Sequence, residues 1–232
     1  MHSVFLLQVT KKLSRKLAAE FVGTAGLLAI VVGSGIMAER LASGNSAVAL
    51  LGNSIATGAG LVILIYGFGV ISGAHFNPAV TLTENLGGRI ESMDAIYYTM
   101  VQIVGAVVGV VIANLMFDLP AINFSTKLRT GFGQYLGEFI ATFGLIGVIR
   151  LGVRFWPHLV GTLVACYITA AYWFTSSTSF ANPAVTIARS LSNTFAGIAP
   201  ETVPMFIVSQ LAGAVVAMIF FNWLLLEVDN NE

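Results

Sequence analysis

The sequence of 232 residues predicts an all-α membrane protein with six transmembrane helices and two shorter re-entrant half-helices. Three observations support this fold class: a composition that is 56% hydrophobic and only 9% charged, six long apolar runs, and a pentapeptide that occurs twice. A soluble domain carries about 25% charged residues, so this composition argues against a water-soluble globule, a disordered chain and a nucleic-acid-binding protein. The expected surroundings are therefore the lipid bilayer.

Each of the six apolar runs is long enough to cross about 30 Å of hydrocarbon, which takes about 20 residues. The runs cover residues 17–38, 49–71, 95–117, 133–153, 157–177 and 203–226. The connections between them are short, so a single domain over residues 1–232 is expected, with no separate soluble part. The first run follows a basic segment, residues 1–16, and is too long for the apolar core of a signal peptide, so it is predicted to be a retained span.

The positions of Lys and Arg predict the orientation of the chain in the membrane. With the N-terminus inside, seven of these residues lie on the inner face and four on the outer face. An excess of Lys and Arg marks the cytoplasmic side. Because six spans return the chain to the side where it began, both termini are expected in the cytoplasm.

The second half of the sequence repeats three features of the first half in the same order. A stretch that begins Glu20-Phe21 corresponds to one that begins Glu138-Phe139, and a stretch that begins at Gln102 corresponds to one that begins at Gln210. Between them, Asn-Pro-Ala-Val-Thr occurs identically at residues 77–81 and 182–186. We therefore expect two repeats, approximately residues 17–117 and 133–226. Three spans separate equivalent points, so the repeats enter the membrane from opposite faces, as in many transporters and channels.

Each Asn-Pro-Ala is expected to start a short helix, because Asn is a good N-cap and Pro is favoured at the first helical position. The first of these helices is predicted to end near Gly87-Gly88 and the second near Ser192-Asn193. About ten residues rise about 15 Å, which is half of the bilayer. Two such half-helices would bring their positive dipole ends, with Asn77 and Asn182, together at the midplane. Non-helical backbone at that depth persists only beside a water-filled cavity or inside protein, so the pattern predicts a pore.

At these residues the chain resembles the aquaporin and glycerol-facilitator family, the major intrinsic proteins, over residues 17–226. The most specific part of the resemblance is residues 72–81, Ser-Gly-Ala-His-Phe-Asn-Pro-Ala-Val-Thr. The two motifs that would line the pore are Asn77, Pro78 and Ala79 in the first half and Asn182, Pro183 and Ala184 in the second. The resemblance implies an aquaporin-like right-handed bundle, a pore through each protomer, and a homotetramer in the inner (plasma) membrane.

Glu20 and Glu138 are carboxylates inside predicted spans, where a charge costs about 2.5 to 3.5 kcal/mol and needs an internal partner. As proton relays, they would make the protein a coupled secondary transporter. Both occupy the same position in the repeats and neither has a basic neighbour, which favours structural hydrogen-bond acceptors. The resemblance implies that they hold the half-helix loops, and that His75 shapes the first loop.

Members of the family set selectivity with four residues, and counting from the two Asn residues places them at Thr57, Ala170, Ser179 and Val185. The aromatic residue, the His and the Arg that water-selective relatives have at these positions are absent. This absence predicts a wider, less polar constriction that admits uncharged solutes larger than water and lets protons leak more readily. Arg189 lies one turn beyond Val185. It is predicted to be an outer-mouth cation, and the alternative is a displaced filter residue.

A Val at the usual Arg position resembles a bacterial branch associated with arsenical resistance. The predicted function is a passive channel for small neutral solutes: glycerol, water and trivalent arsenicals such as arsenous acid. The alternatives are a water-selective channel, a proton-coupled transporter that uses Glu20 and Glu138, and a scaffold without flux. No nucleophile and base occur at enzymatic spacing, so an enzyme is not expected. With one cysteine, Cys166, and no Cys/His cluster, no disulfide, metal site or cofactor is expected either.

Overall fold

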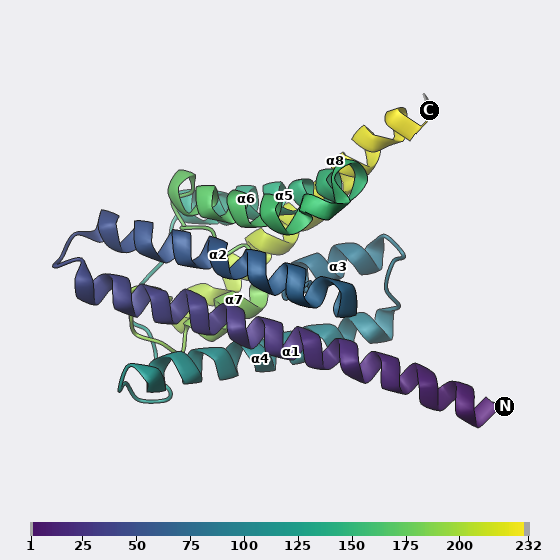
Figure 1. Ribbon diagram of the computed structural model, residues 1–232. Coiled ribbons are helices and arrows are strands. Elements are labelled where there is room, and N and C mark those ends of the chain that lie inside the picture. Colours follow the sequence, from purple (N-terminus) through teal and green to yellow (C-terminus); the bar gives the residue numbers. More distant parts are fainter. Residues whose placement is uncertain (1, 230–232) are drawn as a thin grey trace.

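The computed structural model describes residues 2–229, and the side chains of residues 12–226. It is a bundle of long helices with two short helices inside it (Figure 1). The long helices are α1 (His2–Leu41), α2 (Ser46–Ser72), α4 (Ser92–Met116), α5 (Phe132–Phe155), α6 (Val160–Phe174) and α8 (Val203–Asp229). The short ones are α3 (Pro78–Leu86) and α7 (Pro183–Arg189), and the 3-10 turns η1 (Pro157–Leu159) and η2 (Pro200–Thr202) precede α6 and α8. The predicted all-α class is confirmed.

Five helical stretches among the described residues are long and apolar enough to cross a membrane. They are Lys12–Leu41 of α1, the whole of α2, α4 and α5, and Pro200–Leu226 of η2 and α8. The remaining helix, α6, has 15 residues and rises about 22 Å. The 3-10 turn before it adds about 6 Å, so the two together approach the thickness of the bilayer core.

The predicted span 157–177 ends early, at Phe174. Thr175 leaves the helix in an extended conformation, with φ −106° and ψ 138°. A run of five Ser and Thr residues, 175–179, follows and leads toward the second short helix. Such residues bond to nearby backbone groups and compete with helix formation, which explains why the span stops here.

The two halves of the chain pack in corresponding ways. In the first half α1 packs against α2 and α4, and in the second half α5 packs against α6 and α8. A Cβ added at Gly105 on α4 would meet the backbone oxygen of Phe21, and one added at Gly213 on α8 would meet that of Phe139. Small residues therefore allow two helix pairs to approach closely, as is typical of helix packing in lipid.

Both ends of the described chain lie on one side of the bundle, which we call the terminal side (Figure 1). The opposite side, the loop side, carries the segments 117–131 and 190–199, which together we call the loop-side cap. Asn123 and Ser192 form an isolated β-bridge between these segments, and Ala199 N donates to Lys127 O at 2.8 Å. The cap is thus held together by backbone hydrogen bonds.

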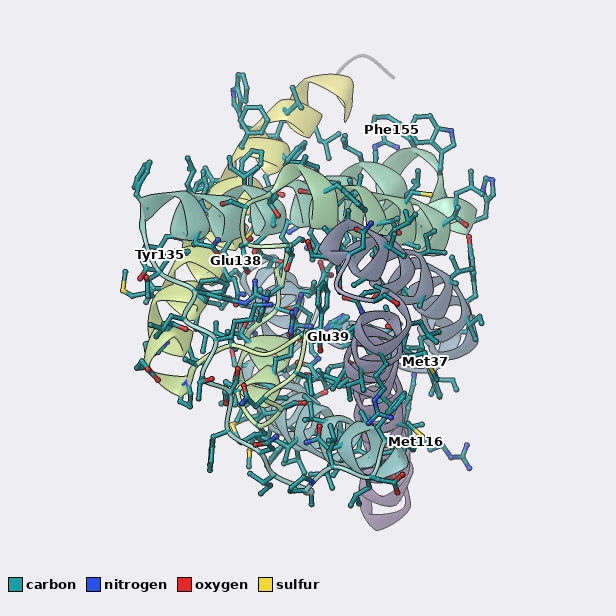
Figure 2. All side chains as sticks on the ribbon, turned by 90° about the vertical axis from the view of Figure 1, so that its left-hand side faces the viewer. Met37, Glu39, Met116, Tyr135, Glu138 and Phe155 are labelled. Atoms are coloured by element: carbon teal, nitrogen blue, oxygen red, sulfur yellow. The ribbon has the colours of Figure 1, made fainter. Side chains whose placement is uncertain are left out.

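The outside of the bundle is apolar. Met37, Met116 and Phe155 have 46%, 61% and 41% of their surface exposed, and they lie at the edge of the molecule when it is viewed from the loop side (Figure 2). Glu138 lies in the interior of the same view. Many further large apolar side chains are exposed around the helices, far more than a soluble monomer shows. The chain is a multi-pass membrane protein, with lipid as its surroundings.

Candidate functional site

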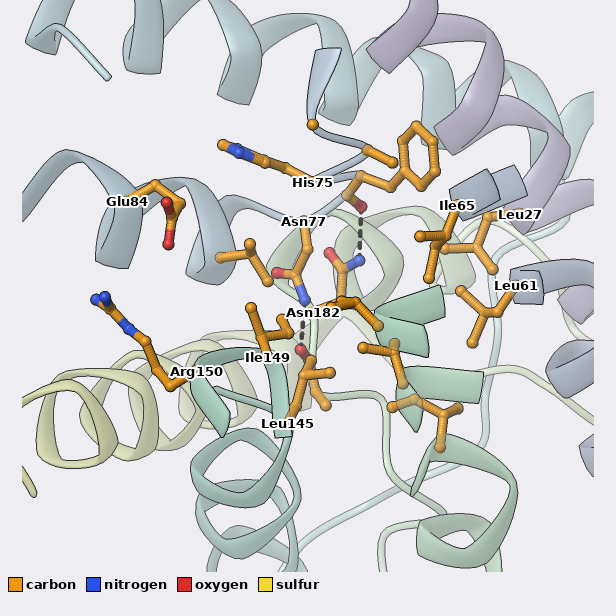
Figure 3. A pocket seen from close by; sticks show the side chains of 18 of the residues that line it. Leu27, Leu61, Ile65, His75, Asn77, Glu84, Leu145, Ile149, Arg150 and Asn182 are labelled. Carbon is orange, nitrogen blue, oxygen red and sulfur yellow. Dashed lines mark hydrogen bonds between the residues drawn. The ribbon is translucent and has the colours of Figure 1, made fainter. Parts of the chain in front are cut away.

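A cavity of about 980 Å³ runs inside the bundle from Arg89 and Leu226 on the terminal side to Arg189, the residue that precedes the loop-side cap. Its wall consists mainly of aliphatic side chains, several of which surround the two Asn residues in Figure 3. The aliphatic residues include Leu27, Val31, Leu61, Ile65, Leu145, Ile149, Val164 and Ile168. Such side chains offer no hydrogen bonds, so polar contacts with a solute are confined to a few places along the cavity.

The two short helices begin as the sequence predicts. Asn77 Oδ1 accepts from Ala79 N at 2.9 Å, and Asn182 Oδ1 accepts from Ala184 N at 3.0 Å. The first helix has nine residues and ends at Leu86, close to its predicted end. The second has seven residues and ends at Arg189, before its predicted end near residues 192–193. It stops there because the carbonyls of residues 190 and 191 accept from Ser125 N and Asn123 N, in the other segment of the loop-side cap, and not from the next helical turn.

Each Asn also donates to the loop of the other half (Figure 3). Asn77 Nδ2 donates to Ala181 O, and Asn182 Nδ2 donates to Phe76 O, both at 2.8 Å. An amide NH₂ group carries two hydrogens, so each Asn retains one donor beyond the crossed bonds. Both side chains line the cavity. The centre of the cavity therefore presents two fixed donors, one from each half.

Glu138 joins the second loop to α8 through three hydrogen bonds. Its Oε1 accepts from Phe180 N at 2.9 Å, and its Oε2 accepts from Ala181 N at 2.9 Å and from Gln210 Nε2 at 2.5 Å. Ala181 has a φ of +49°. A non-glycine residue in such a conformation costs about 1 to 3 kcal/mol. The carboxylate offsets that cost by accepting the backbone N–H of the strained residue.

Glu20 makes the corresponding contacts in the first loop. Its Oε1 accepts from His75 N at 3.0 Å, and its Oε2 accepts from Phe76 N at 2.7 Å and from Gln102 Nε2 at 2.9 Å. Phe76 has a φ of +48°, close to that of its counterpart Ala181.

Glu20 and Glu138 are both completely buried, and neither lines the cavity. These are the contacts that structural acceptors would make. A proton relay would need a path from the cavity to the carboxylates, and the cavity wall contains neither of them. His75 does line the cavity, and its Nδ1 lies 3.1 Å from Thr81 Oγ1.

The loop-side end of the cavity is lined by buried residues. Thr57, Ser179 and Val185, three of the four residues predicted for the filter, line the cavity there, and 2%, 2% and 5% of their surface is exposed. Ala170 differs from the prediction, because it is exposed on α6 and is not part of the wall. Tyr172 lines the cavity instead, with its hydroxyl 3.3 Å from Thr57 Oγ1. Two residues correspond to about 200° of helix rotation, so only one of the two can face inward.

Arg189 is buried in the cavity wall, with 2% of its surface exposed. Its guanidinium carbon lies 3.4 Å from the centre of the Phe180 ring, and its Nε donates to Ala196 O. This position corrects the prediction of a cation at the outer mouth. A guanidinium and two aromatic rings, those of Tyr172 and Phe180, also lie at this end, where the sequence predicts a less polar constriction. Counting from the Asn residues reaches none of the three.

The terminal-side end of the cavity carries more exposed charges. Arg89 and Glu84 form an ion pair with a distance of 2.5 Å between Nε and Oε2. Arg150 Nη2 donates to Thr83 O at 3.4 Å, and Figure 3 shows Arg150 at the same end as Glu84. Glu84 is the one carboxylate among the described residues of the wall. The described side chains contain no group of His, Cys, Asp or Glu that could hold a metal ion.

Known proteins resemble this chain over most of its length. The family model described as "Major intrinsic protein" matches residues 8–154. The protein "Aquaglyceroporin AqpS" of Rhizobium meliloti is 53% identical over 213 residues, which cover 92% of this chain and 91% of the relative. "Aquaporin Z" of Photorhabdus laumondii is 31% identical over 154 residues, 63% of this chain and 64% of the relative. The X-ray structure of the aquaglyceroporin from Plasmodium falciparum has the same fold, with a TM-score of 0.72 at 19% identity over 95% of this chain and 100% of that one.

Proposed function

This chain belongs to the major intrinsic protein family, and on that premise we propose that it is a passive transmembrane channel for small uncharged solutes such as glycerol. The observation that carries the proposal is the make-up of the cavity. Its wall is largely aliphatic, two Asn amides stand at its centre, and the one carboxylate described in it is paired with Arg89 at the terminal end. A neutral hydroxylated solute can exchange water for these few donors, whereas an ion would lose its hydration without replacement.

The proposed solute range includes glycerol, water and trivalent arsenicals such as arsenous acid. Arsenous acid is a neutral hydroxide of about the size of glycerol at pH 7, so the same donors suit both. Val185 supports this range because it is an apolar side chain where water-selective relatives have an Arg. The name of the relative AqpS, an aquaglyceroporin, points to the same class.

A water-selective channel is the second candidate, and one observation favours it. The rings of Tyr172 and Phe180 and the guanidinium of Arg189 all lie at the loop-side end. Bulky groups at a constriction exclude larger solutes. Solute permeability therefore decides between the two candidates.

The test is stopped-flow permeability of liposomes that contain the purified protein. Water, glycerol and arsenous acid would be compared in the wild type, Val185→Arg and the control Val48→Arg, whose side chain is 52% exposed near the start of α2. We expect the glycerol permeability of the wild type and of the control to be well above that of protein-free liposomes. The Val185→Arg variant should lose its permeability to glycerol and arsenous acid before its permeability to water. Water flux without glycerol flux would favour the second candidate, and no flux from assembled protein would refute the channel. Equal permeabilities in the wild type and Val185→Arg would remove the argument from Val185.

We include in the proposal a homotetramer in the bacterial inner (plasma) membrane, with both termini in the cytoplasm. The excess of Lys and Arg on the terminal side supports this orientation, and the matched contacts of Glu20 and Glu138 support one channel domain built from two inverted repeats. Protease accessibility of tagged termini in sealed vesicles tests the orientation, and the mass of the detergent-solubilised protein tests the oligomer.

A further inference from the structure

Two buried arginines share one aromatic ring at the loop-side end of the cavity. The guanidinium carbon of Arg189 lies 3.4 Å from the centre of the Phe180 ring, and that of Arg129 lies 4.9 Å from it. Arg129 belongs to the loop-side cap, and 8% of its surface is exposed. A guanidinium over an aromatic face is attracted by the electrons of the ring. Phe180 therefore fixes the position of both cations.

Backbone carbonyls hold these arginines. Arg129 donates from Nε to Gly197 O at 3.0 Å and from Nη1 to Ser177 O at 3.1 Å, and Arg189 donates from Nε to Ala196 O. The ion pair found among the described side chains, between Arg89 and Glu84, lies at the other end of the cavity. Among the described side chains, no carboxylate lies at ion-pair distance from either arginine. Burial lowers the pKa of Arg129 to about 10, which leaves it charged at neutral pH.

Two groups at this end have hydrogen-bonding capacity that the protein leaves open. The hydrogen bond of Arg189 uses Nε, so its two Nη groups remain as donors at the cavity wall. Ser179 Oγ is buried and has no hydrogen-bond partner among the described residues, although Ser179 lines the same end of the cavity. An unpaired buried hydroxyl is costly. Its place at the same end of the cavity as the free donors of Arg189 indicates a partner that both donates and accepts, which is a property of a hydroxyl group.

We propose that Arg189 is the specificity-determining cation of this channel and that, together with Ser179, it forms a subsite for a hydroxyl group of a neutral polyol or hydroxide. The proposal rests on the proposed function as a solute channel. An Nη–H of Arg189 donates to the hydroxyl oxygen of the solute, and the solute O–H donates to Ser179 Oγ. Arg129 acts through Phe180 as a positioning residue, and its charge adds to the repulsion of cations. The cation that is missing at Val185 is thereby supplied from one helical turn away.

The test measures two properties in the same proteoliposomes: the ratio of glycerol to water permeability, and the Na⁺ leak under an imposed membrane potential. The variants are Arg189→Met, which removes the charge, Arg189→Lys, which keeps the charge without the planar fork, Arg129→Met and Ser179→Ala. Arg40→Met is the matched control. Arg40 also lies over a Phe ring, at 5.1 Å from the centre of Phe117, and donates to that residue's carbonyl at 2.8 Å, but it is not part of the cavity wall.

We expect Arg189→Met to raise the Na⁺ leak about tenfold or more, because a repelling charge at the loop-side end of the cavity is lost. Arg129→Met should raise it by a smaller factor. Arg189→Lys should keep the leak low and reduce the ratio of glycerol to water permeability several-fold, and Ser179→Ala should reduce that ratio without a leak. The Arg40→Met control should match the wild type.

Size-exclusion chromatography would show whether each variant assembles. Wild-type leak and wild-type permeability ratio in assembled Arg189→Met would overturn the inference and leave the channel function intact. If Arg189→Met does not assemble, an unchanged permeability ratio in Arg189→Lys overturns it. Absence of glycerol flux in the wild type would instead refute the proposed function.

Discussion

Replacing Glu138 with Gln is expected to destabilise the second re-entrant loop. In the wild type the carboxylate accepts from three donors: Phe180 N, Ala181 N and Gln210 Nε2. A Gln side chain has one oxygen that accepts and one NH₂ group that donates. Whichever way it is turned, at least one of the three donors faces the NH₂ group and loses its partner.

The size of the effect follows from these three bonds. With the Gln oxygen toward Ala181 and Gln210, the N–H of Phe180 is left unpaired, which costs about 1 to 3 kcal/mol. The two remaining bonds change from charge-assisted to neutral, which weakens each by about 1 kcal/mol. Removing a buried charge offsets part of this loss. The expected net loss of stability is about 3 kcal/mol.

The assay is thermal unfolding of the detergent-solubilised protein followed by size exclusion, together with glycerol flux in liposomes. Glu138→Gln should unfold at a lower temperature and conduct less, and Glu201→Gln, at an exposed position on η2, should change stability by less than about 0.5 kcal/mol. A Glu138→Gln protein as stable as this control would refute the structural role. Solute flux that follows a pH gradient in the wild type, and is lost in a stable variant, would establish a relay instead.

Two further predictions concern the helix packing and the loop-side cap. Gly213→Ala should destabilise the protein by about 1 to 3 kcal/mol in the same unfolding assay, because the added Cβ would meet the backbone oxygen of Phe139. Gly67→Ala, where nothing lies within 4 Å of the added atom, should be neutral or slightly stabilising, and equal effects of the two changes would contradict the close helix crossing. The pKa of Lys127 is lowered to about 8, first by burial and then by two neighbouring arginines, against the opposing effect of Glu39. Lys127 therefore loses its charge as the pH rises through about 8, and the Na⁺ leak of the wild type should rise between pH 7 and pH 9. The Lys127→Met variant should show the higher leak at both pH values. A wild-type leak that does not change with pH would contradict a role for this charge.

The starts of the short helices could be predicted because their signals are local. Asn followed by Pro specifies an N-cap and a first helical residue from neighbouring backbone geometry alone, and Asn77 and Asn182 cap their helices in this way. The sequence also predicts that Glu20 and Glu138 are structural hydrogen-bond acceptors, because each carboxylate occupies the same place in its repeat. Sequence alone did not show which donors they take, since backbone groups from 42 to 56 residues away supply them.

The loop-side end of the cavity could not be predicted in the same way. Counting from Asn182 to α6 crosses an irregular segment in which Thr178, Ser179 and Ala181 have positive φ. A shift of two residues turns a helix position by about 200°, so the count lands on exposed Ala170 where Tyr172 faces the cavity. The prediction that Arg189 lies at the outer mouth is wrong for a different reason. Its position depends on the Phe180 ring and on a carbonyl of the loop-side cap, which no helical period encodes.

Placement, not net charge, sets the electrostatics of the cavity. The chain has eleven basic and eleven acidic residues, yet two of the acidic side chains, Glu20 and Glu138, are turned away from the cavity to hold loop backbone. The guanidinium of Arg189 faces the cavity without a carboxylate partner at ion-pair distance among the described residues. A cation that entered from the terminal side would therefore meet amide donors at the centre and a positive charge at the loop-side end. A neutral hydroxyl group would meet donors at both points, so the same arrangement that excludes cations favours the passage of uncharged solutes.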